Sequence, residues 1–296
     1  MKLTGQADFF IKQYGADKGI EKLKKLGYTY LTYDLYEVSE DSGFASWTKD
    51  QLEAHFMPIR EAIEKYGMKM IYLTLSRGIY NDRVPSAFEN RKKWCLQAVR
   101  TAACIGAEFV GIQPVFFYKY HEKPYELSKE LSTEAFQMTK AEADRCQIQL
   151  AFINNPKPGV YGSDGKDLLE LANRYQAKIL LDPSAAFRAG ERVEDIIRCV
   201  EKHLLAFFVN DVDRARGVPF FPMMGALNYR KIIESLNNLS DSVCLTAMYT
   251  SVYKRYQDFD KEEAFVDAMA TFLYRMLLML DGREAYEDEA WNTTGI

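Results

Sequence analysis

Histidine is scarce in this chain, with only His55, His121 and His203 among 296 residues. A zinc cluster that needs several histidines is therefore not expected. The five cysteines are odd in number and no two of them form a C-x-x-C pair, which argues against both a zinc knuckle and a redox dithiol. Widely spaced cysteines in apolar surroundings are typical of reduced thiols, so we expect a cytoplasmic protein.

The chain also has no excess of basic residues and no long apolar run. Lys and Arg number 38 against 42 Asp and Glu, a formal net charge of −4, whereas a nucleic-acid partner would need a basic stripe. The most apolar segment, residues 264–280, contains Asp267 and Arg275 and is shorter than the roughly 20 residues that cross a bilayer. The first ten residues do not have the pattern of a signal peptide. We therefore expect neither a nucleic-acid nor a membrane partner.

Short apolar runs typical of buried strands alternate with amphipathic helical segments along the chain. The expected strands are residues 4–9, 28–36, 69–75, 109–113, 148–153, 178–181, 205–209 and 243–246, and the expected helices are residues 18–26, 47–66, 87–105, 133–146, 166–175, 193–202, 228–236 and 261–280. This α/β pattern predicts a single (β/α)8 TIM barrel over residues 1–280. A doubly wound sheet is the alternative, but it usually carries a glycine-rich loop after its first strand, and residues 6–15 contain none. Residues 281–296 form an acidic tail, interpreted as a rim cover, a subunit contact or a partly disordered segment.

Polar residues follow the predicted strands, and loops that leave the C-terminal ends of barrel strands meet at one rim. Asp182 is the centre of this prediction, because it directly follows the buried run of residues 178–181. Gln6 and Asp8 follow the first strand. The candidate catalytic residues are Asp182, Asp34, Glu37 and Asp211, and the candidate substrate-binding residues are Asn154, Asn155, Gln113, Arg77, Lys157, Arg188, Asn210, Arg214, Phe116 and Tyr249. Amides, hydroxyls and aromatic rings suit a sugar or polyol. The alternative for each residue is that it caps a helix or satisfies loop backbone.

Four segments carry a resemblance to a known family: L-A-F-I-N-N at 150–155, I-L-L-D-P-S-A-A-F-R-A-G at 179–190, F-F-V-N-D at 207–211 and P-M-M-G-A-L-N-Y at 222–229. In their order and spacing, these segments resemble the motifs of the sugar phosphate isomerase/epimerase family, the xylose isomerase-like TIM barrels. The resemblance covers about residues 3–280. It implies the barrel fold and a sugar-like or polyol substrate.

The same resemblance implies a degenerate metal site. The family holds one divalent cation with a Glu, an Asp, a His and a second Glu, which polarises the substrate oxygen. Here the four positions match Ile153, Asp182, Phe208, and Thr246 or Ala247. One ligand of four remains, so we expect no metal and no other cofactor.

Two functions follow as hypotheses. The first is an isomerase, epimerase or lyase that works without the metal, with Asp182 as the base assisted by Asp34, Glu37 or Asp211. The basic residues Arg77, Lys157, Arg188 and Arg214 would then hold a phosphate or carboxylate, or stabilise an enediolate; alternatively, each pairs with a rim carboxylate. The second is a catalytically silent barrel that binds a carbohydrate or partners an active paralogue. Under either hypothesis, a homo-oligomer is compatible with the sequence.

Aromatic residues suggest the width of the pocket. They are Phe116, Phe117, Tyr118 and Tyr120 after the fourth strand, and Tyr249, Tyr253 and Tyr256 after the eighth. Rings in rim loops stack on ligands or seal subunit contacts. They would wall a pocket suited to a sugar with an apolar aglycone or to a partner's loop. Alternatively, they pack on Tyr286 and Trp291 of the tail.

Overall fold

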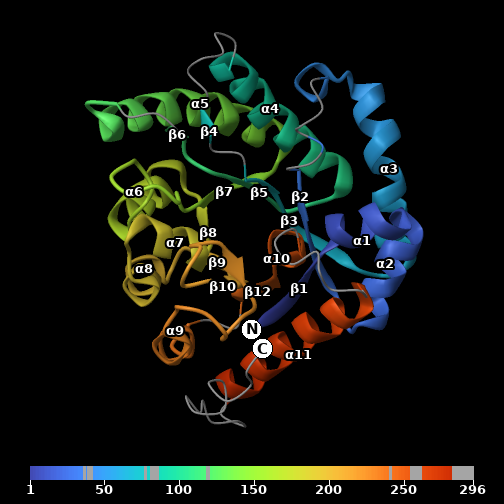
Figure 1. Cartoon of the computed structure of the whole chain (residues 1–296). Helices are drawn as coiled ribbons and strands as arrows, with labels where there is room; N and C mark the ends of the chain where they lie inside the picture. Colours follow the sequence, from blue (N-terminus) through green and yellow to red (C-terminus); the bar gives the residue numbers. More distant parts are fainter. Residues whose placement is uncertain are drawn as a thin grey trace.

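The computed structural model describes residues 1–35, 38, 43–76, 79–80, 87–117, 121–239, 242–253 and 262–281. Eight parallel strands close into a barrel (Figure 1). Their order around the barrel is β1 (Lys2–Gln6), β12 (Cys244–Ala247), β9 (Leu204–Val209), β8 (Lys178–Leu181), β7 (Gln149–Ile153), β5 (Phe109–Ile112), β3 (Lys69–Leu75) and β2 (Tyr30–Asp34). The predicted (β/α)8 barrel is thereby confirmed. The tail beyond residue 281 lies outside the described residues.

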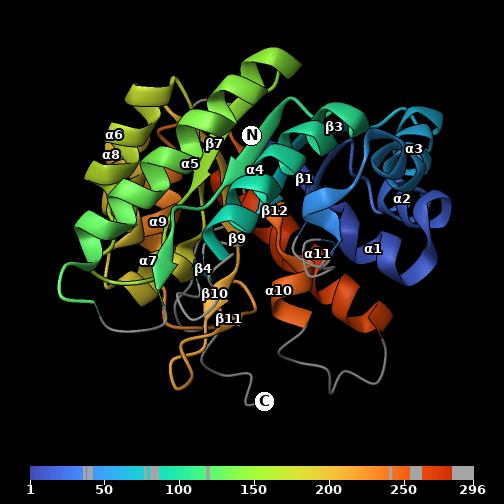
Figure 2. The same ribbon diagram turned by 90° about the horizontal axis from the view of Figure 1, so that it is seen from above.

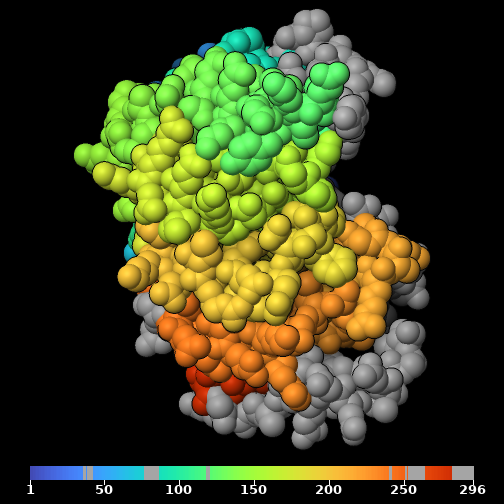
Figure 3. Space-filling view, turned by 90° about the vertical axis from the view of Figure 1, so that its left-hand side faces the viewer, coloured from blue at the N-terminus to red at the C-terminus, as the bar shows by residue number. Residues whose placement is uncertain are grey.

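An outer layer of helices surrounds the strands. It contains α2 (Ala16–Lys25), α3 (Lys49–Lys65), α4 (Ala87–Ile105), α5 (Pro124–Cys146), α6 (Gly165–Tyr175), α8 (Val193–Val200), α9 (Tyr229–Leu236) and α11 (Glu262–Leu280). On the face shown in Figure 3, the surface segments follow one another in sequence order, from green α5 to orange α9. Within the described part of the chain, every helix is too short or too polar to cross a membrane.

Local signals explain where these helices begin. Thr48 and Gln51 form a capping box at the start of α3: the Gln51 amide donates to Thr48 Oγ1 at 3.3 Å, and the Thr48 amide donates to Gln51 Oε1 at 2.8 Å. Asp164 caps α6 by accepting from the Asp167 amide at 2.8 Å. These exchanges satisfy amides that have no partner inside the helix.

Two segments differ from the sequence prediction. The expected first strand of residues 4–9 ends at Gln6, and helix α1 (Ala7–Tyr14) begins at once because its pattern buries Phe9 and Phe10 on one face. The expected loop after β8 is helix α7 (Pro183–Ala189). Asp182 is its N-cap and Pro183 its first residue, a combination that starts helices because proline needs no amide partner there.

Short elements gather at the end of the barrel opposite the N-terminus (Figure 2). They include a parallel pair, β4 (Ile79–Tyr80) with β6 (Phe116–Phe117), and an antiparallel pair, β10 (Asp211–Val212) with β11 (Pro219–Phe220). Helix α10 (Tyr249–Tyr253) follows β12 at this end. The C-terminal ends of the barrel strands open here, and we call this end the mouth.

The barrel interior is packed with side chains. Its apolar cluster consists of Ile71, Tyr72, Phe109, Ala151, Ile153, Leu180, Leu205, Ala206, Phe208 and Cys244. The Tyr72 hydroxyl is hydrogen-bonded to Thr246, which also bonds Thr4. A packed floor of this kind is normal for a TIM barrel, and it leaves any ligand to the mouth.

Candidate functional site

Two polar clusters lie at the mouth, each where neighbouring strands end. We define the Asp8 cluster as Gln6, Asp8, Asp34, Ser76 and Thr250, and the Asp182 cluster as Gln113, Asn154, Asp182, Ser184 and Asn210. The first joins the ends of β1, β2, β3 and β12, and the second joins the ends of β5, β7, β8 and β9. Together they make the mouth polar on two sides of the apolar floor.

The Asp8 cluster is organised around one carboxyl group. Asp8 Oδ1 accepts from the Asp34 amide at 2.9 Å, and Oδ2 accepts from Gln6 Nε2 and Thr250 Oγ1, each at 3.0 Å. Gln6 is itself held by the Thr250 amide, which donates to its Oε1 at 2.9 Å. Asp34 Oδ2 accepts from Ser76 Oγ at 2.7 Å. The chain turns directly from β1 into α1, and this turn brings Asp8 beside the end of β2.

Burial and the neighbouring Asp34 raise the pKa of Asp8 to about 7, with burial the larger cause. Hydrogen bonds from the Asp34 amide and Thr250 oppose this rise without cancelling it. A carboxyl group that is close to half protonated at neutral pH is suited to proton transfer, and such groups concentrate at functional sites.

A narrow crevice adjoins this cluster and reaches the barrel floor. It is too narrow to admit a water molecule, and its lining residues are Gln6, Thr32, Asp34, Tyr72, Thr74, Phe208 and Met248. Asp34 is thus the member of the carboxyl pair that faces the crevice. Burial raises the pKa of Tyr72 far above its usual value, so its hydroxyl stays protonated.

The Asp182 cluster is held together by amide side chains. The Asn154 side chain makes two hydrogen bonds to the backbone of Asp182: its Nδ2 donates to Asp182 O at 2.9 Å, and its Oδ1 accepts from the Asp182 amide at 2.7 Å. Gln113 Nε2 donates to Asn154 O at 3.0 Å. Asp182 Oδ1 accepts from the Ser184 amide at 2.9 Å, Ser184 Oγ at 2.8 Å and Asn210 Nδ2 at 3.3 Å. The structure therefore brings together four predicted site residues: Gln113, Asn154, Asp182 and Asn210.

A family model for the xylose isomerase-like TIM barrel matches residues 20–275. The chain belongs to this family. No curated protein matches its sequence. The fold of this family member is similar to that of D-psicose 3-epimerase with D-tagatose from Clostridium cellulolyticum H10, at 13% identity and a TM-score of 0.68 over 95% of this chain and 99% of the other. It is similar to a D-tagatose 3-epimerase-like protein at 13% identity and a TM-score of 0.69, covering 96% and 100%.

A third similar structure, the IOLI protein with a binding zinc atom, shares 14% identity at a TM-score of 0.67, over 97% of this chain and 100% of the other. The residues of the present family member do not fit such an ion. Ile153 and Phe208 are buried in the apolar floor, and Thr246 is engaged by Thr4 and Tyr72. Among the described residues, no group of three or more His, Cys, Asp or Glu side chains is placed to hold a metal. Among the side chains that the structure describes, Asp182 has no further anionic ligand beside it, so we derive no chemical step through a metal.

Asp211, predicted as a catalytic residue, has a structural environment. Its carboxylate accepts from the amides of Val212, Gly225 and Leu227 at 2.7, 2.9 and 3.0 Å. Burial raises its pKa to about 6 despite these bonds. The fit is tight, because a Cβ atom at Gly225 would lie 2.3 Å from Val212 O. The prediction is therefore corrected: Asp211 braces the turn before α9.

Asn155 and Tyr249, predicted to contact substrate, are also interior residues. Asn155 Nδ2 donates to Val115 O and Tyr161 O, each at 3.3 Å, and so fastens the loop after β7. Tyr249 stacks on Phe9 with ring centroids 5.6 Å apart. The sequence pattern marks both as rim residues because it gives a position in the chain without the direction of the side chain. Both predictions are corrected to structural roles.

The remaining predicted residues are spread more widely. Arg188 is exposed on α7 and donates from Nε to Ser184 O at 3.2 Å, and Arg214 is exposed in the turn between β10 and β11. Lys157 donates to Phe117 O, and Phe116 lies partly buried on β6. Phe117 is buried against the His121 ring, with centroids 4.5 Å apart. Positions outside the described residues are Glu37, Arg77, Tyr118, Tyr120, Tyr256, Tyr286 and Trp291.

Sequence reasoning placed Asp8 at the rim without giving it a role, and it missed Thr250. The available signal was the pair Gln6 and Asp8 after the first strand. The shift in the pKa of Asp8 depends on Asp34 and on burial, so no local pattern reveals it.

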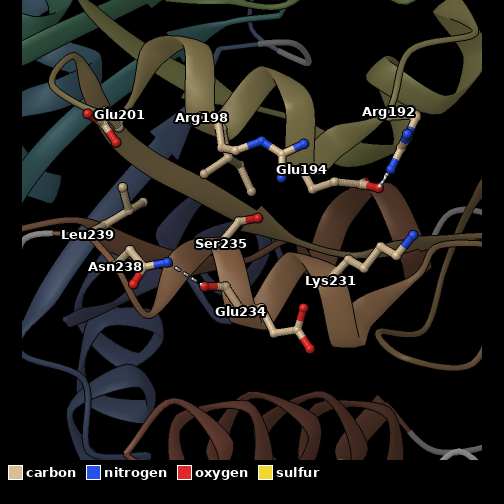
Figure 4. A pocket seen from close by; sticks show the side chains of 10 residues that line it. Arg192, Glu194, Arg198, Glu201, Lys231, Glu234, Ser235, Asn238 and Leu239 are labelled. Carbon is tan, nitrogen blue, oxygen red and sulfur yellow. Dashed lines mark hydrogen bonds and ion pairs between the residues drawn. The ribbon is translucent and has the colours of Figure 1, made fainter.

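A groove of about 560 Å³ lies away from the mouth, between the outer helices α8 and α9 (Figure 4). Its charges are mixed: Arg192 Nη2 pairs with Glu194 Oε1 at 2.8 Å, and Lys231 and Glu234 also line it. Asn238 Nδ2 donates to the backbone Glu234 O at 3.0 Å. The groove is larger than the crevice, but only one of its polar lining side chains, Glu194, is buried, and it is paired with Arg192. We place the candidate site at the mouth for that reason.

Proposed function

We propose that this protein is an isomerase or epimerase of a sugar, whose carbonyl group acidifies the neighbouring C–H bond, and that it transfers protons with side-chain carboxyl groups without a metal ion. The observation that carries the proposal is the Asp8 and Asp34 pair beside the crevice, in which the pKa of Asp8 is about 7. Removing and returning a proton next to a carbonyl requires a general base, and the pair places one carboxyl group, Asp34, at the crevice and a second, Asp8, behind it to hold a proton. Family membership and the sugar epimerases among the similar structures support this substrate class.

In this proposal Asp34 is the base, because it faces the crevice and Ser76 orients its carboxylate. Asp8 lies behind it, and when Asp8 holds its proton it adds no second negative charge beside Asp34. The neutral Tyr72 hydroxyl is hydrogen-bonded to Thr246 and closes the floor of the crevice beneath this pair. Asp182, predicted as the base, is assigned to binding because three donors hold one of its oxygens.

Solvent deuterium exchange tests the proposal directly. The protein would be incubated with D-psicose, D-tagatose and D-fructose in D2O containing a metal chelator, and exchange at carbon would be followed by NMR. We expect exchange with at least one sugar, reduced at least about 100-fold in Asp34→Asn. Asp144→Asn is the matched control, because it removes a carboxylate from the surface of α5, where it pairs with Lys140. Exchange that requires added metal, or that survives Asp34→Asn, would refute the mechanism.

A second candidate function is binding without catalysis. The observation in its favour is the filled floor, where Phe208 and Ile153 are buried and the crevice is narrow. Sugar binding by calorimetry without any deuterium exchange would favour this reading, in which the chain is a carbohydrate sensor or the partner of an active paralogue.

A further inference from the structure

Asn210 carries a buried hydrogen-bond acceptor that no group in the described part of the protein satisfies. The residue is 1% exposed, and its Oδ1 accepts no hydrogen bond there. Its Nδ2 donates to Asp182 Oδ1 at 3.3 Å. Rotating the amide by half a turn gives no relief, because the oxygen would then face a carboxylate. A buried acceptor without a donor costs free energy, so a water molecule or a ligand group is expected to supply the donor.

Asp182, joined to Asn210 by that hydrogen bond, has spare accepting capacity and an unbalanced charge. All three of its donors reach Oδ1, and all are neutral. No lysine or arginine of the described ranges forms an ion pair with it; Arg188, six residues along the chain, is exposed and donates to Ser184 O. Its side chain is partly buried, which weakens screening by water.

The surroundings of these two acceptors offer few donors. Both polar ends of the Asn154 amide are used on the backbone of Asp182. The adjacent floor, at Ile153 and Phe208, is apolar. A ligand group that brings several donors and one positive charge would satisfy both acceptors and balance the carboxylate. A hydroxyl group supplies one donor and no charge, and a divalent cation would meet a single carboxylate.

We propose that Asp182 and Asn210 form a subsite for a protonated primary amine, so that the substrate class is amino sugars or amino polyols. The inference rests on the proposed function for the presence of a sugar at the mouth. An ammonium group has three donors, which is enough to satisfy Asn210 Oδ1 and the second oxygen of Asp182 at once. It also balances the charge of the Asp182 carboxylate. A hydrogen bond between an ammonium group and a carboxylate is stronger than one between neutral groups.

Calorimetric titration with matched pairs of sugars tests the inference. The pairs are D-glucosamine with D-glucose and 1-amino-1-deoxy-D-fructose with D-fructose, at pH 6 and low salt. We expect the amino member of at least one pair to bind at least tenfold more tightly. Asp182→Asn should abolish that preference, with a loss of affinity at least tenfold larger for the amino sugar than for its neutral counterpart. The variant should fold, because asparagine also caps helices well.

Asp195→Asn is the control variant, because it removes a carboxylate from the exposed surface of α8, where it pairs with Arg198. It should leave the preference unchanged. Equal binding of amino and neutral sugars would overturn the amine subsite and leave sugar binding intact. A preference that survives Asp182→Asn would also overturn it. Binding of none of the four sugars would count against both the subsite and the proposed function.

Discussion

Phe208 stacks on Tyr72 across the barrel interior, with ring centroids 6.4 Å apart and ring planes 14° from parallel. Phe208 stands at the position where the family resemblance places a metal-binding histidine, and Tyr72 belongs to the opposite wall, on β3. The contact between the two rings makes the barrel centre apolar at the place where the family resemblance implies a metal ion. The polar groups that remain lie on either side of this stack, in the Asp8 and Asp182 clusters.

We predict that Phe208→Ala destabilises the protein by about 3–5 kcal/mol, because a buried ring is lost and a cavity remains beside Tyr72. Phe208 is 3% exposed. Denaturation in urea measures the change. The matched control is Phe187→Ala on α7, where the ring is 40% exposed and the expected change is within about 0.5 kcal/mol. Equal effects of the two substitutions would contradict a packed floor.

We predict that the protein holds no stoichiometric divalent metal at the mouth. Ile153 and Phe208 offer no ligand atoms, and a cation beside them would lose hydration without compensation. Elemental analysis of protein grown with added manganese provides the measurement. One metal per chain that is lost in Asp182→Asn would show the prediction to be wrong.

The barrel itself was predictable from the sequence, because eight buried strands alternate with amphipathic helices. Each strand is an apolar run and each helix an amphipathic segment, so both can be recognised from neighbouring residues alone. The segment Asp182–Pro183 has the residues of a helix start, but a proline directly after a strand is equally typical of a loop. The end of the first strand is ambiguous in the sequence for the same kind of reason, since Phe9 and Phe10 fit the buried face of a helix as well as a strand.

The site was predictable in part. Strand ends located Asp182, Asn154 and Asn210 correctly relative to one another, because parallel strands end at one rim. Side-chain direction was not predictable in the same way: Asp211 and Tyr249 also follow strands, yet one braces a turn and the other joins the core. The importance of Asp8 depends on a neighbour 26 positions away in the sequence, which only the closed barrel brings near.

We predict that Asp8 makes stability depend on pH. Its pKa is about 7 in the folded protein and near 4 in the unfolded chain, so the folded state binds the proton more tightly. The contribution of this proton to the free energy of unfolding is complete below about pH 4 and is lost as pH rises through 7. The stability of Asp8→Asn relative to the native protein should therefore rise by roughly 2 kcal/mol between pH 5 and pH 8. Urea denaturation at several pH values gives this difference. Asp211 also has a raised pKa, but it is present in both proteins and cancels. A difference that is flat with pH would contradict a protonated Asp8.

The last prediction concerns Tyr249, whose placement separates a core role from a ligand role. Its hydroxyl lies 2.8 Å from that of Tyr28, and both side chains are buried. The ring also meets Phe10 edge-on at 5.2 Å, so it joins α10 to α1. Burial raises the pKa of Tyr28 to about 12, so that hydroxyl stays neutral at physiological pH.

Tyr249→Phe should keep the ring packing and leave the Tyr28 hydroxyl buried without this partner, at a cost of about 1–3 kcal/mol. Sugar affinity should stay the same, because the side chain does not reach the mouth. The comparison is Tyr274→Phe on α11, where the side chain is 61% exposed and neither stability nor binding should change. Thermal denaturation and calorimetric titration of the two variants separate the roles: weaker sugar binding in Tyr249→Phe at unchanged stability would restore the ligand role first expected from the sequence.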